Sequence, residues 1–242
     1  MIKNWLISAW LASPLAGDAP MLDGILQWEM SLRLGAKHAK KLGKWTRASE
    51  ILDIPIPIAK RTINGHDVFC CSSPILPPLQ APEWVDRTSK RFESSKMAQI
   101  IDPMYRKNVA TGSGAYKSRF APERIRLVDR VCWFVRGDRK EIKKILKDIH
   151  AIGKDRNIGY GFVWQWTFDE MAEDYSIFAP YPHDQHDSHN QHNDKQVLMR
   201  TIPLNNNSNN NLNNICGYKL SFGGYKPPYW HPAFQMEIAV PC

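Results

Sequence analysis

Residues 124–168 read RIRLVDRVCWFVRGDRKEIKKILKDIHAIGKDRNIGYGFVWQWTF, and this stretch decides the fold. Residues 124–136 first alternate apolar with polar side chains and then become mostly apolar, which predicts a β-strand. Gly137 turns the chain. Asp138 and Glu141 have the spacing of a capping box, which predicts that a helix begins at this point.

The predicted helix is amphipathic. One face carries apolar residues at the spacing i, i+3, i+4 and i+7, and the opposite face is basic. The apolar residues are Ile142, Ile145, Leu146 and Ile149, and the basic residues are Arg139, Lys140, Lys143, Lys144 and Lys147. Gly153 has the place of a left-handed C-cap, and a glycine loop leads to a second strand-like run over residues 162–168. Strand, helix, glycine loop and strand together make one half of a ferredoxin-like, or RRM, domain.

The N-terminal part of the chain supplies candidates for the other half. The apolar run over residues 5–11 predicts a strand. Residues 22–30 carry apolar side chains at helical spacing, and Gly35 ends that segment. We therefore expect the fold class to be α+β, with a single ferredoxin-like/RRM domain over residues 1–242.

Two segments do not fit this core. Residues 86–122 are polar, basic and weakly periodic, and we expect them to project as a thumb-like insertion. Residues 183–214 have low complexity, so we expect a partly disordered loop there. It contains four histidines at every third position, which are His183, His186, His189 and His192. This spacing suits Zn²⁺ or Ni²⁺, but such a tract offers no further groups to orient the rings. We therefore predict neither a metal site nor a cofactor.

The charge of the chain points to an anionic partner. Lysine and arginine number 32 against 24 acidic residues, a formal net charge of +8. Residues 100–160 alone hold fifteen basic and seven acidic residues, so this window carries the whole surplus. Concentrated positive charge of this kind favours binding to nucleic acid.

Cysteine usage and hydropathy bear on the compartment. The five cysteines are odd in number and form no C-x-x-C pair, so neither a disulfide framework nor a zinc ribbon is expected. No apolar run approaches the ~20 residues of a membrane helix, and the apolar start of the chain is too short for a signal peptide. These features predict a cytoplasmic protein with reduced thiols and no membrane partner.

The glycine loop is the first candidate RNA contact. Its glycines let the backbone approach a phosphate, two cations add charge, and a tyrosine offers a stacking face. The candidate residues are Gly153, Lys154, Arg156, Gly159, Tyr160 and Gly161. The pattern is neither a P-loop nor a dinucleotide-binding fingerprint. The alternative is a helix cap followed by a turn without a ligand.

The basic insertion is the second candidate RNA contact. Aromatic rings are interleaved with cations around two glycines, which suits single-stranded RNA, because unstacked bases lie on rings while cations meet phosphates. The candidate residues are Tyr105, Arg106, Lys107, Gly112, Gly114, Tyr116, Lys117 and Arg119. The alternative is a solvated, flexible loop.

The tryptophans divide into core and surface candidates. Trp133 and Trp166 lie in strand-like segments and are expected in the core, since large apolar rings gain most from burial. If the alternation is regular, Trp164 lies on the same strand face as Trp166. Trp230, in a proline-rich tail, is either an anchor on a partner or a clamp on its own domain.

Taken in order, several segments resemble the Cas-five family of CRISPR RAMP proteins, most closely the version in type IV effector complexes. They are Ser13-Pro14-Leu15-Ala16-Gly17-Asp18 with Leu22-Asp23-Gly24-Ile25-Leu26, then Gly112-x-Gly114-x-Tyr116-Lys117, then Ile152-Gly153-Lys154 through Gly159-Tyr160-Gly161 with Trp166, and finally Pro227-Pro228-Tyr229-Trp230. The histidine- and asparagine-rich stretch lies outside the resemblance.

The resemblance implies an RRM-like domain whose thumb, around residues 106–119, and whose glycine loop, 153–161, hold RNA. Such a subunit grips the 5′ handle of the guide RNA (crRNA) and caps the filament of backbone subunits, beside the large subunit. Target DNA near the flanking motif is a further candidate partner. Most members do not cut RNA, so no catalytic residue is predicted.

Two other functions remain open from the residues themselves. One is an endoribonuclease that processes precursor crRNA, with His38, His66 or His150 as general acid or base. The other is a protein-interaction module without direct RNA contact, in which Trp230 would be the hot spot.

Overall fold

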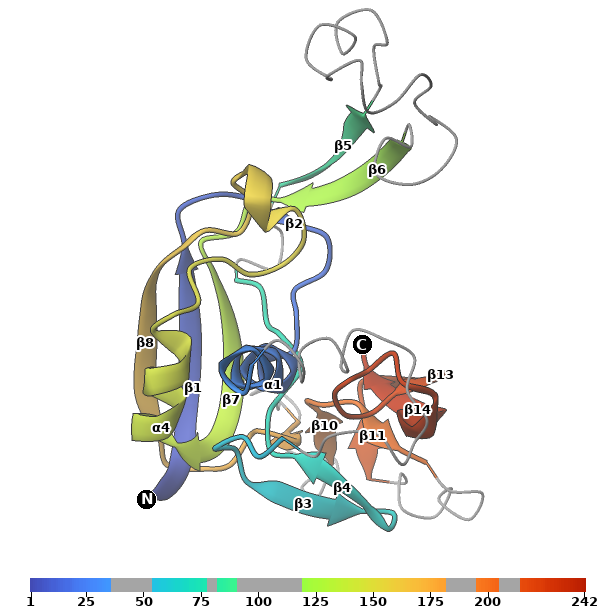
Figure 1. Ribbon diagram of the computed structural model, residues 1–242. Coiled ribbons are helices and arrows are strands. Elements are labelled where there is room, and N and C mark those ends of the chain that lie inside the picture. The colour runs from blue at the N-terminus through green and yellow to red at the C-terminus, as the bar shows by residue number, and fades with distance from the viewer. Residues whose placement is uncertain (36–53, 78–81, 91–118, 182–194, 205–213) are drawn as a thin grey trace, which may run out of the picture.

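The computed structural model describes residues 1–35, 54–77, 82–90, 119–181, 195–204 and 214–242. The fold class is α+β: two helices accompany several small, mostly antiparallel sheets (Figure 1). None of the described helices is both long enough and apolar enough to cross a membrane. In chain order the elements are β1 (Ile2–Leu11), β2 (Leu15–Ala16), α1 (Leu22–Arg33), β3 (Lys60–Ile63), β4 (His66–Phe69), β5 (Glu83–Lys90), β6 (Arg119–Arg126), β7 (Arg130–Asp138), α4 (Arg139–Leu146), η3 (Arg156–Ile158), β8 (Val163–Met171), β9 (Phe178–Pro180), β10 (Gln196–Leu198), β11 (Ile202–Pro203), β12 (Ile215–Cys216), β13 (Tyr218–Gly224), η5 (Pro232–Phe234) and β14 (Gln235–Pro241).

The central sheet has the strand order β7-β1-β8, and β1 is antiparallel to both neighbours. Its alternate residues Trp5, Ile7 and Ala9 pair with Val135, Trp133 and Val131 of β7, and all six are buried. This face packs on α1 and α4, whose buried residues belong to the same core cluster. The periodicity of two in the strands and the apolar stripe of the helix thus meet in one core.

The predicted strand at the N-terminus and the predicted first helix are confirmed as β1 and α1. The predicted helix after Gly137 is confirmed as α4, and its apolar stripe is buried. The carboxylate of Asp138 accepts hydrogen bonds from the N–H groups of Lys140 and Glu141, as an N-cap does. The capping box is only half formed, because Glu141 pairs with Lys144 and the N–H of Asp138 donates to Pro57.

The predicted C-cap is wrong. Helix α4 ends at Leu146, and Gly153 lies several residues beyond it. Gly153 does have a positive φ of 83°. That conformation brings its backbone against Leu15 instead, where a Cβ would lie 2.7 Å from Leu15 Cδ1.

The predicted strand over residues 124–136 is two strands. β6 ends at Arg126, and β7 begins at Arg130. β6 pairs with β5 in an antiparallel arm that leaves one end of the central sheet (Figure 1). The expected insertion over 86–122 therefore begins and ends in paired strands, and its residues 91–118 lie outside the described residues.

A β-bulge in β8 overturns the expectation for Trp164. Trp166 stacks on Trp133 in the core, with ring centroids 6.1 Å apart, as expected. Between Trp10 and Leu11 of β1 the register slips, since Trp10 pairs with Gln165 and Leu11 with Val163. Trp164 is the extra residue, and it lies beside Trp10 on the face opposite the helices.

The outer edge of β7 is lined by irregular backbone from residues 57–59 and 70–75, on either side of the β3–β4 hairpin. Ala59 and Cys70 bond to the backbone of Arg136, and Ser72 donates to Phe134 at 2.8 Å. Farther along, Ile75 and Cys132 exchange two backbone hydrogen bonds of 2.9 Å. The prolines at 55, 57 and 74 explain why no regular strand forms here, since proline cannot donate to a ladder.

The low-complexity prediction was wrong for part of its range. Residues 195–204, inside the expected disordered loop, contain β10 and β11, and Leu198, Arg200 and Ile202 are buried. The four histidines and the core of the asparagine run fall in 182–194 and 205–213, outside the described residues.

Arg200 joins this C-terminal part to α1. Its Nη2 lies 2.7 Å from Oδ2 of Asp23, and both side chains are fully buried. Tyr229 donates its hydroxyl to the same carboxylate at 2.8 Å, and Arg200 Nη1 donates to the carbonyl of Cys71. Burial is the largest single influence and opposes the charged form of Arg200. The charge and hydrogen bond of Asp23, together with Tyr229 and Cys71, outweigh it and hold the pKa of Arg200 above its usual value.

The five cysteines are free thiols with very different exposure. Burial, followed by the charge of Asp23, raises the pKa of the Cys71 thiol to about 12. Because the thiolate is the reactive form, we expect a disulfide reagent at about pH 8 to modify the exposed Cys242 and leave Cys71 unmodified. Mass spectrometry of the labelled peptides measures this. Labelling of all five thiols in denaturant is the control, and fast labelling of Cys71 in the folded protein would contradict the burial.

Candidate nucleic-acid interface

The glycine loop lies against the first loop of the chain at one end of the central sheet. Lys154 N–H donates to Ala16 O at 2.9 Å, and Gly161 N–H donates to Pro14 O at 2.8 Å. The N–H of Phe162 donates to Ser13 Oγ. Two segments that are far apart in the sequence thus form one double loop beside the base of the arm.

Two of the three glycines in this loop are required by close packing. Gly161 has a φ of 63°, and a Cβ there would collide with the carbonyl oxygen of Ile152. Gly153 has little more space beside Leu15. Gly159 also has a positive φ, of 101°, but faces open space. The backbone at the tip, around Gly159, is therefore the part of the loop that a ligand can approach.

Two predicted contact residues brace the loop against the arm. The Lys154 ammonium forms an ion pair with the buried carboxylate of Glu123 in β6. Tyr160 donates its hydroxyl to Asp86 Oδ2 in β5 at 3.0 Å, and this hydrogen bond raises the pKa of Tyr160. These two contacts hold the glycine loop against the arm. The side chain of Lys154 is still exposed.

Arg156 is the loop cation that is most available to a ligand. It begins the short turn η3 at the tip, where its side chain is exposed. It forms no ion pair with any other described residue. Its guanidinium can therefore donate to a phosphate without breaking an existing pair.

A hollow of about 760 Å³ lies between α1 and residues 148–157. Arg33 of α1 pairs with an acid from each wall of the hollow, with Glu29 at 3.1 Å and with Asp148 at 2.7 Å. Trp28, which is 44% exposed, forms part of its wall, and Arg156 stands on the opposite side. The hollow thus combines an aromatic face with a cation that forms no ion pair within the described part of the chain.

Sequence reasoning missed Trp28. Ile25, Trp28 and Leu32 stand at i, i+3 and i+7 on α1 and form a second apolar stripe beside the buried one. A helix that packs on a single core needs only one apolar stripe. The second stripe on α1 was therefore the sequence signal that could have identified Trp28.

The predicted contacts of the insertion lie outside the described residues, namely Tyr105, Arg106, Lys107, Gly112, Gly114, Tyr116 and Lys117. Arg119, the first residue of β6, lies opposite Lys90 of β5 in the antiparallel register. At the base of the arm, Glu83 pairs with both Arg124 and Arg126, at 3.1 and 2.7 Å. Two of the arginines at the base of the arm thus share one carboxylate.

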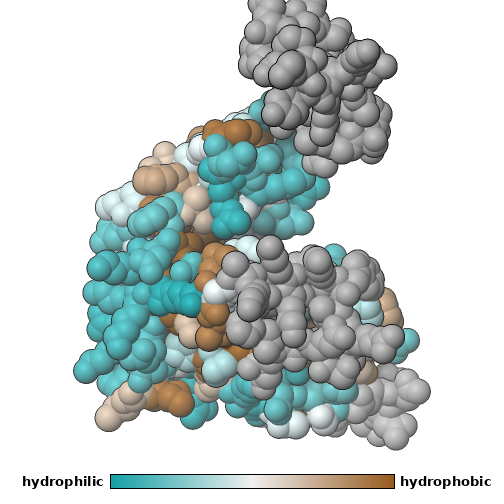
Figure 2. Space-filling model, in the orientation of Figure 1, coloured by the Kyte–Doolittle hydropathy of each residue, from teal (hydrophilic) through white to brown (hydrophobic). Residues whose placement is uncertain are grey.

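The surface over α4 is strongly hydrophilic in Figure 2, and apolar patches interrupt the surface near the base of the arm. On α4, Lys144 pairs with Glu141, and Arg139 lies over the rings of Trp5 and Phe168. Part of the basic surplus of residues 100–160 is therefore displayed on α4, away from the glycine loop.

The candidate catalytic histidines are scattered. His66 packs on the ring of Tyr225, with centroids 5.3 Å apart, whereas His150 lines the hollow beside α1. His38 lies outside the described residues. Within the described ranges, no three metal-ligating side chains gather into a cluster.

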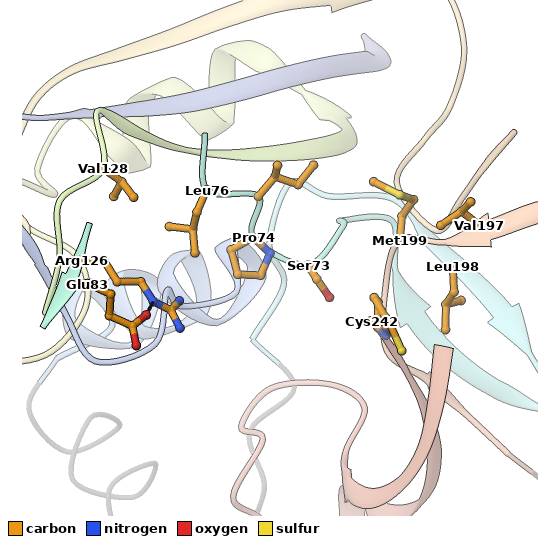
Figure 3. Close-up of a pocket in the computed structure, with 12 residues that line it drawn as sticks. Ser73, Pro74, Leu76, Glu83, Arg126, Val128, Val197, Leu198, Met199 and Cys242 are labelled. Atoms are coloured by element: carbon orange, nitrogen blue, oxygen red, sulfur yellow. Dashed lines mark hydrogen bonds and ion pairs between the residues drawn. The ribbon is translucent and has the colours of Figure 1, made fainter. Parts of the chain in front are cut away.

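A second cavity, of about 460 Å³, lies between the base of the arm and the end of the chain (Figure 3). Its walls are mainly apolar, with Leu76, Val128 and Leu198 among them. The charged groups drawn at its edge, Glu83 and Arg126, already pair with each other. It therefore offers no free charged group to an RNA.

Comparison with known protein families finds no family that matches the chain, and no curated protein matches it significantly.

Proposed function

We propose that this chain is a non-catalytic guide-RNA subunit, which grips the 5′ handle of a crRNA in a type IV CRISPR effector complex. One observation carries the proposal. The first loop, the glycine loop and the root of the basic insertion meet at one end of the central sheet, held by Lys154–Glu123 and Tyr160–Asp86. The first loop and the glycine loop are two of the segments on which the resemblance to Cas-five proteins rests, and a third segment, residues 112–117, belongs to the insertion that this root carries.

The proposal includes a ferredoxin-like, or RRM, core. The order β8-β1-β7 and the two helices on one face support it. So does the irregular backbone of residues 57–59 and 70–75, which lies along β7 where such a sheet has its remaining strand. Prolines make that strand irregular in this chain.

In this proposal the RNA is held by position and charge. The backbone around Gly159 and the guanidinium of Arg156 meet phosphates, and the hollow beside Trp28 receives an unstacked base. The insertion supplies the remaining cations and rings. Catalysis is not needed for this task.

The proposed partners follow from the same resemblance. They are the backbone and large subunits of the complex, with target DNA near the flanking motif as a further candidate, in the cytoplasm. The fourth segment of the resemblance has a structural duty, because Tyr229 is bonded to Asp23 beneath α1.

Replacing Arg156 with alanine is expected to weaken binding of short single-stranded RNA about tenfold, the effect of one charged hydrogen bond. Loss of one phosphate contact also reduces the slope of log affinity against log salt by about 0.7. Fluorescence anisotropy across a salt series measures both, with Lys219→Ala on the exposed strand β13 as the matched control. Wild-type affinity and slope in Arg156→Ala would contradict this placement of the RNA.

The same samples distinguish the alternatives. Intact RNA in the presence of EDTA supports the non-catalytic function, whereas specific fragments that disappear in His150→Ala indicate an endoribonuclease. If partner subunits copurify after nuclease treatment while RNA does not bind, the chain is a protein-interaction module.

A further inference from the structure

Three side chains gather on the open face of the central sheet, opposite the helices. Trp10 of β1 and Arg130 of β7 are paired positions, and the guanidinium lies 4.8 Å from the centroid of the Trp10 ring. Trp164 of β8 lies on the other side of Trp10, with centroids 6.4 Å apart and ring planes inclined by 54°. The three form a row across the sheet, the Trp10–Arg130–Trp164 row.

The bulge presents Trp164 to solvent. With regular alternation it would face the core as Trp166 does, but the slipped register turns it to the open face, where 58% of it is exposed. A bulge is a built feature that re-aims a side chain, and an exposed indole beside a second indole loses the burial that normally stabilises it. These two facts point to a ligand that covers the exposed Trp164 ring.

The polar groups of the row leave the ring faces available. Trp10 Nε1 donates to Thr167 Oγ1 at 3.2 Å, which holds the ring edge in place. Arg130 covers Trp10 and forms no ion pair among the described residues. Its donors are therefore open to an anion that lies beside the rings.

We propose that the Trp10–Arg130–Trp164 row is a stacking platform for bases of single-stranded RNA, with Trp164 beneath a base and Arg130 at a neighbouring phosphate. The row rests on the proposed function, since it extends the path of the same RNA. Base–aromatic stacking tolerates any sequence, so this platform holds nucleotides without reading them.

The chemistry favours a base over a protein side chain. Anchors of protein interfaces fill pockets, and these rings line neither the hollow beside α1 nor the cavity at the end of the chain. A flat base needs only a flat ring with a cation nearby. The row also adjoins the double loop, because the N–H of Ala12, next after β1, donates to the carbonyl of Phe162, which precedes β8.

The test is binding of labelled oligouridine and oligoadenosine of about ten nucleotides to the full chain. Trp164→Ala is expected to weaken binding about 5- to 150-fold and to leave the salt slope unchanged, while Trp164→Phe retains most of the affinity. Arg130→Gln is expected to reduce the salt slope by about 0.7. Trp230→Ala, which removes another exposed tryptophan, is the control and should bind like wild type.

Each outcome decides the inference. Wild-type affinity in Trp164→Ala, or equal losses in Trp164→Ala, Trp164→Phe and Trp230→Ala, would overturn the platform. If Arg156→Ala still weakens binding in that case, the proposed function stands without it. No RNA binding by the wild-type chain at any salt concentration would overturn both.

Discussion

Replacing Asp23 with alanine is expected to lower the free energy of unfolding by about 3–5 kcal/mol, the range for removing one partner of a buried ion pair. Arg200 would be left as a buried cation. Its hydrogen bonding is already incomplete, because its Nε lacks a hydrogen-bond partner among the described residues. Tyr229 would lose its acceptor as well. Domains have about 5–15 kcal/mol of stability in total, so the variant is expected to unfold at much lower denaturant concentration.

Urea unfolding followed by tryptophan fluorescence measures the change. The control is Glu170→Gln, which breaks the exposed pair with Lys3 and should change stability by less than about 1 kcal/mol. The double variant Asp23→Leu/Arg200→Met should recover part of the loss, since no charge remains buried. Equal effects of Asp23→Ala and Glu170→Gln would show that the buried pair does not hold α1 to the C-terminal part.

Replacing Gly161 with alanine is expected to destabilise the protein by about 2–5 kcal/mol. A left-handed backbone costs about 1–2 kcal/mol in any residue with a Cβ, and overpacking adds about 1–3 kcal/mol. The clash is with backbone, the carbonyl oxygen of Ile152, which cannot rotate away. That carbonyl belongs to the segment that leads into the loop, so RNA binding is expected to fall too.

Gly159→Ala is the matched control, because it has the same kind of backbone conformation and open space around it. It should cost only the backbone strain, about 1–2 kcal/mol. Thermal unfolding and RNA affinity of the two variants separate packing from ligand contact. If Gly159→Ala destabilises more than Gly161→Ala, the packing of the loop against Ile152 is wrong.

The contacts of the glycine loop differ from the roles that the sequence suggested for its residues. The pattern of glycines, cations and a tyrosine identified the segment, but all of its members were interpreted as RNA contacts. Gly161 instead packs on Ile152, Lys154 pairs with Glu123, and Tyr160 pairs with Asp86. Only Arg156 and the backbone around Gly159 keep the proposed role of RNA contact unchanged.

Local sequence determined the elements whose signals lie within a few residues. The stripe of α4 repeats at helical spacing, and Asp138 caps the N–H groups two and three residues ahead. The same holds for β1, whose short apolar run over residues 5–11 predicts a strand. Such signals are readable because both partners of each interaction lie in one short window.

Tertiary structure decided what depends on distant partners. Asp23 meets Arg200 across 177 positions, in a segment whose composition predicted disorder. A bulge of one residue turned Trp164 from the core to the open face beside Trp10, because the side-chain period of a strand is two and a single insertion reverses it. The sequence by itself thus specified β1, α1, α4 and the basic character of the chain. The folded chain decided how the described cations are paired and which rings face solvent, since pairing and burial depend on neighbours that only folding brings together.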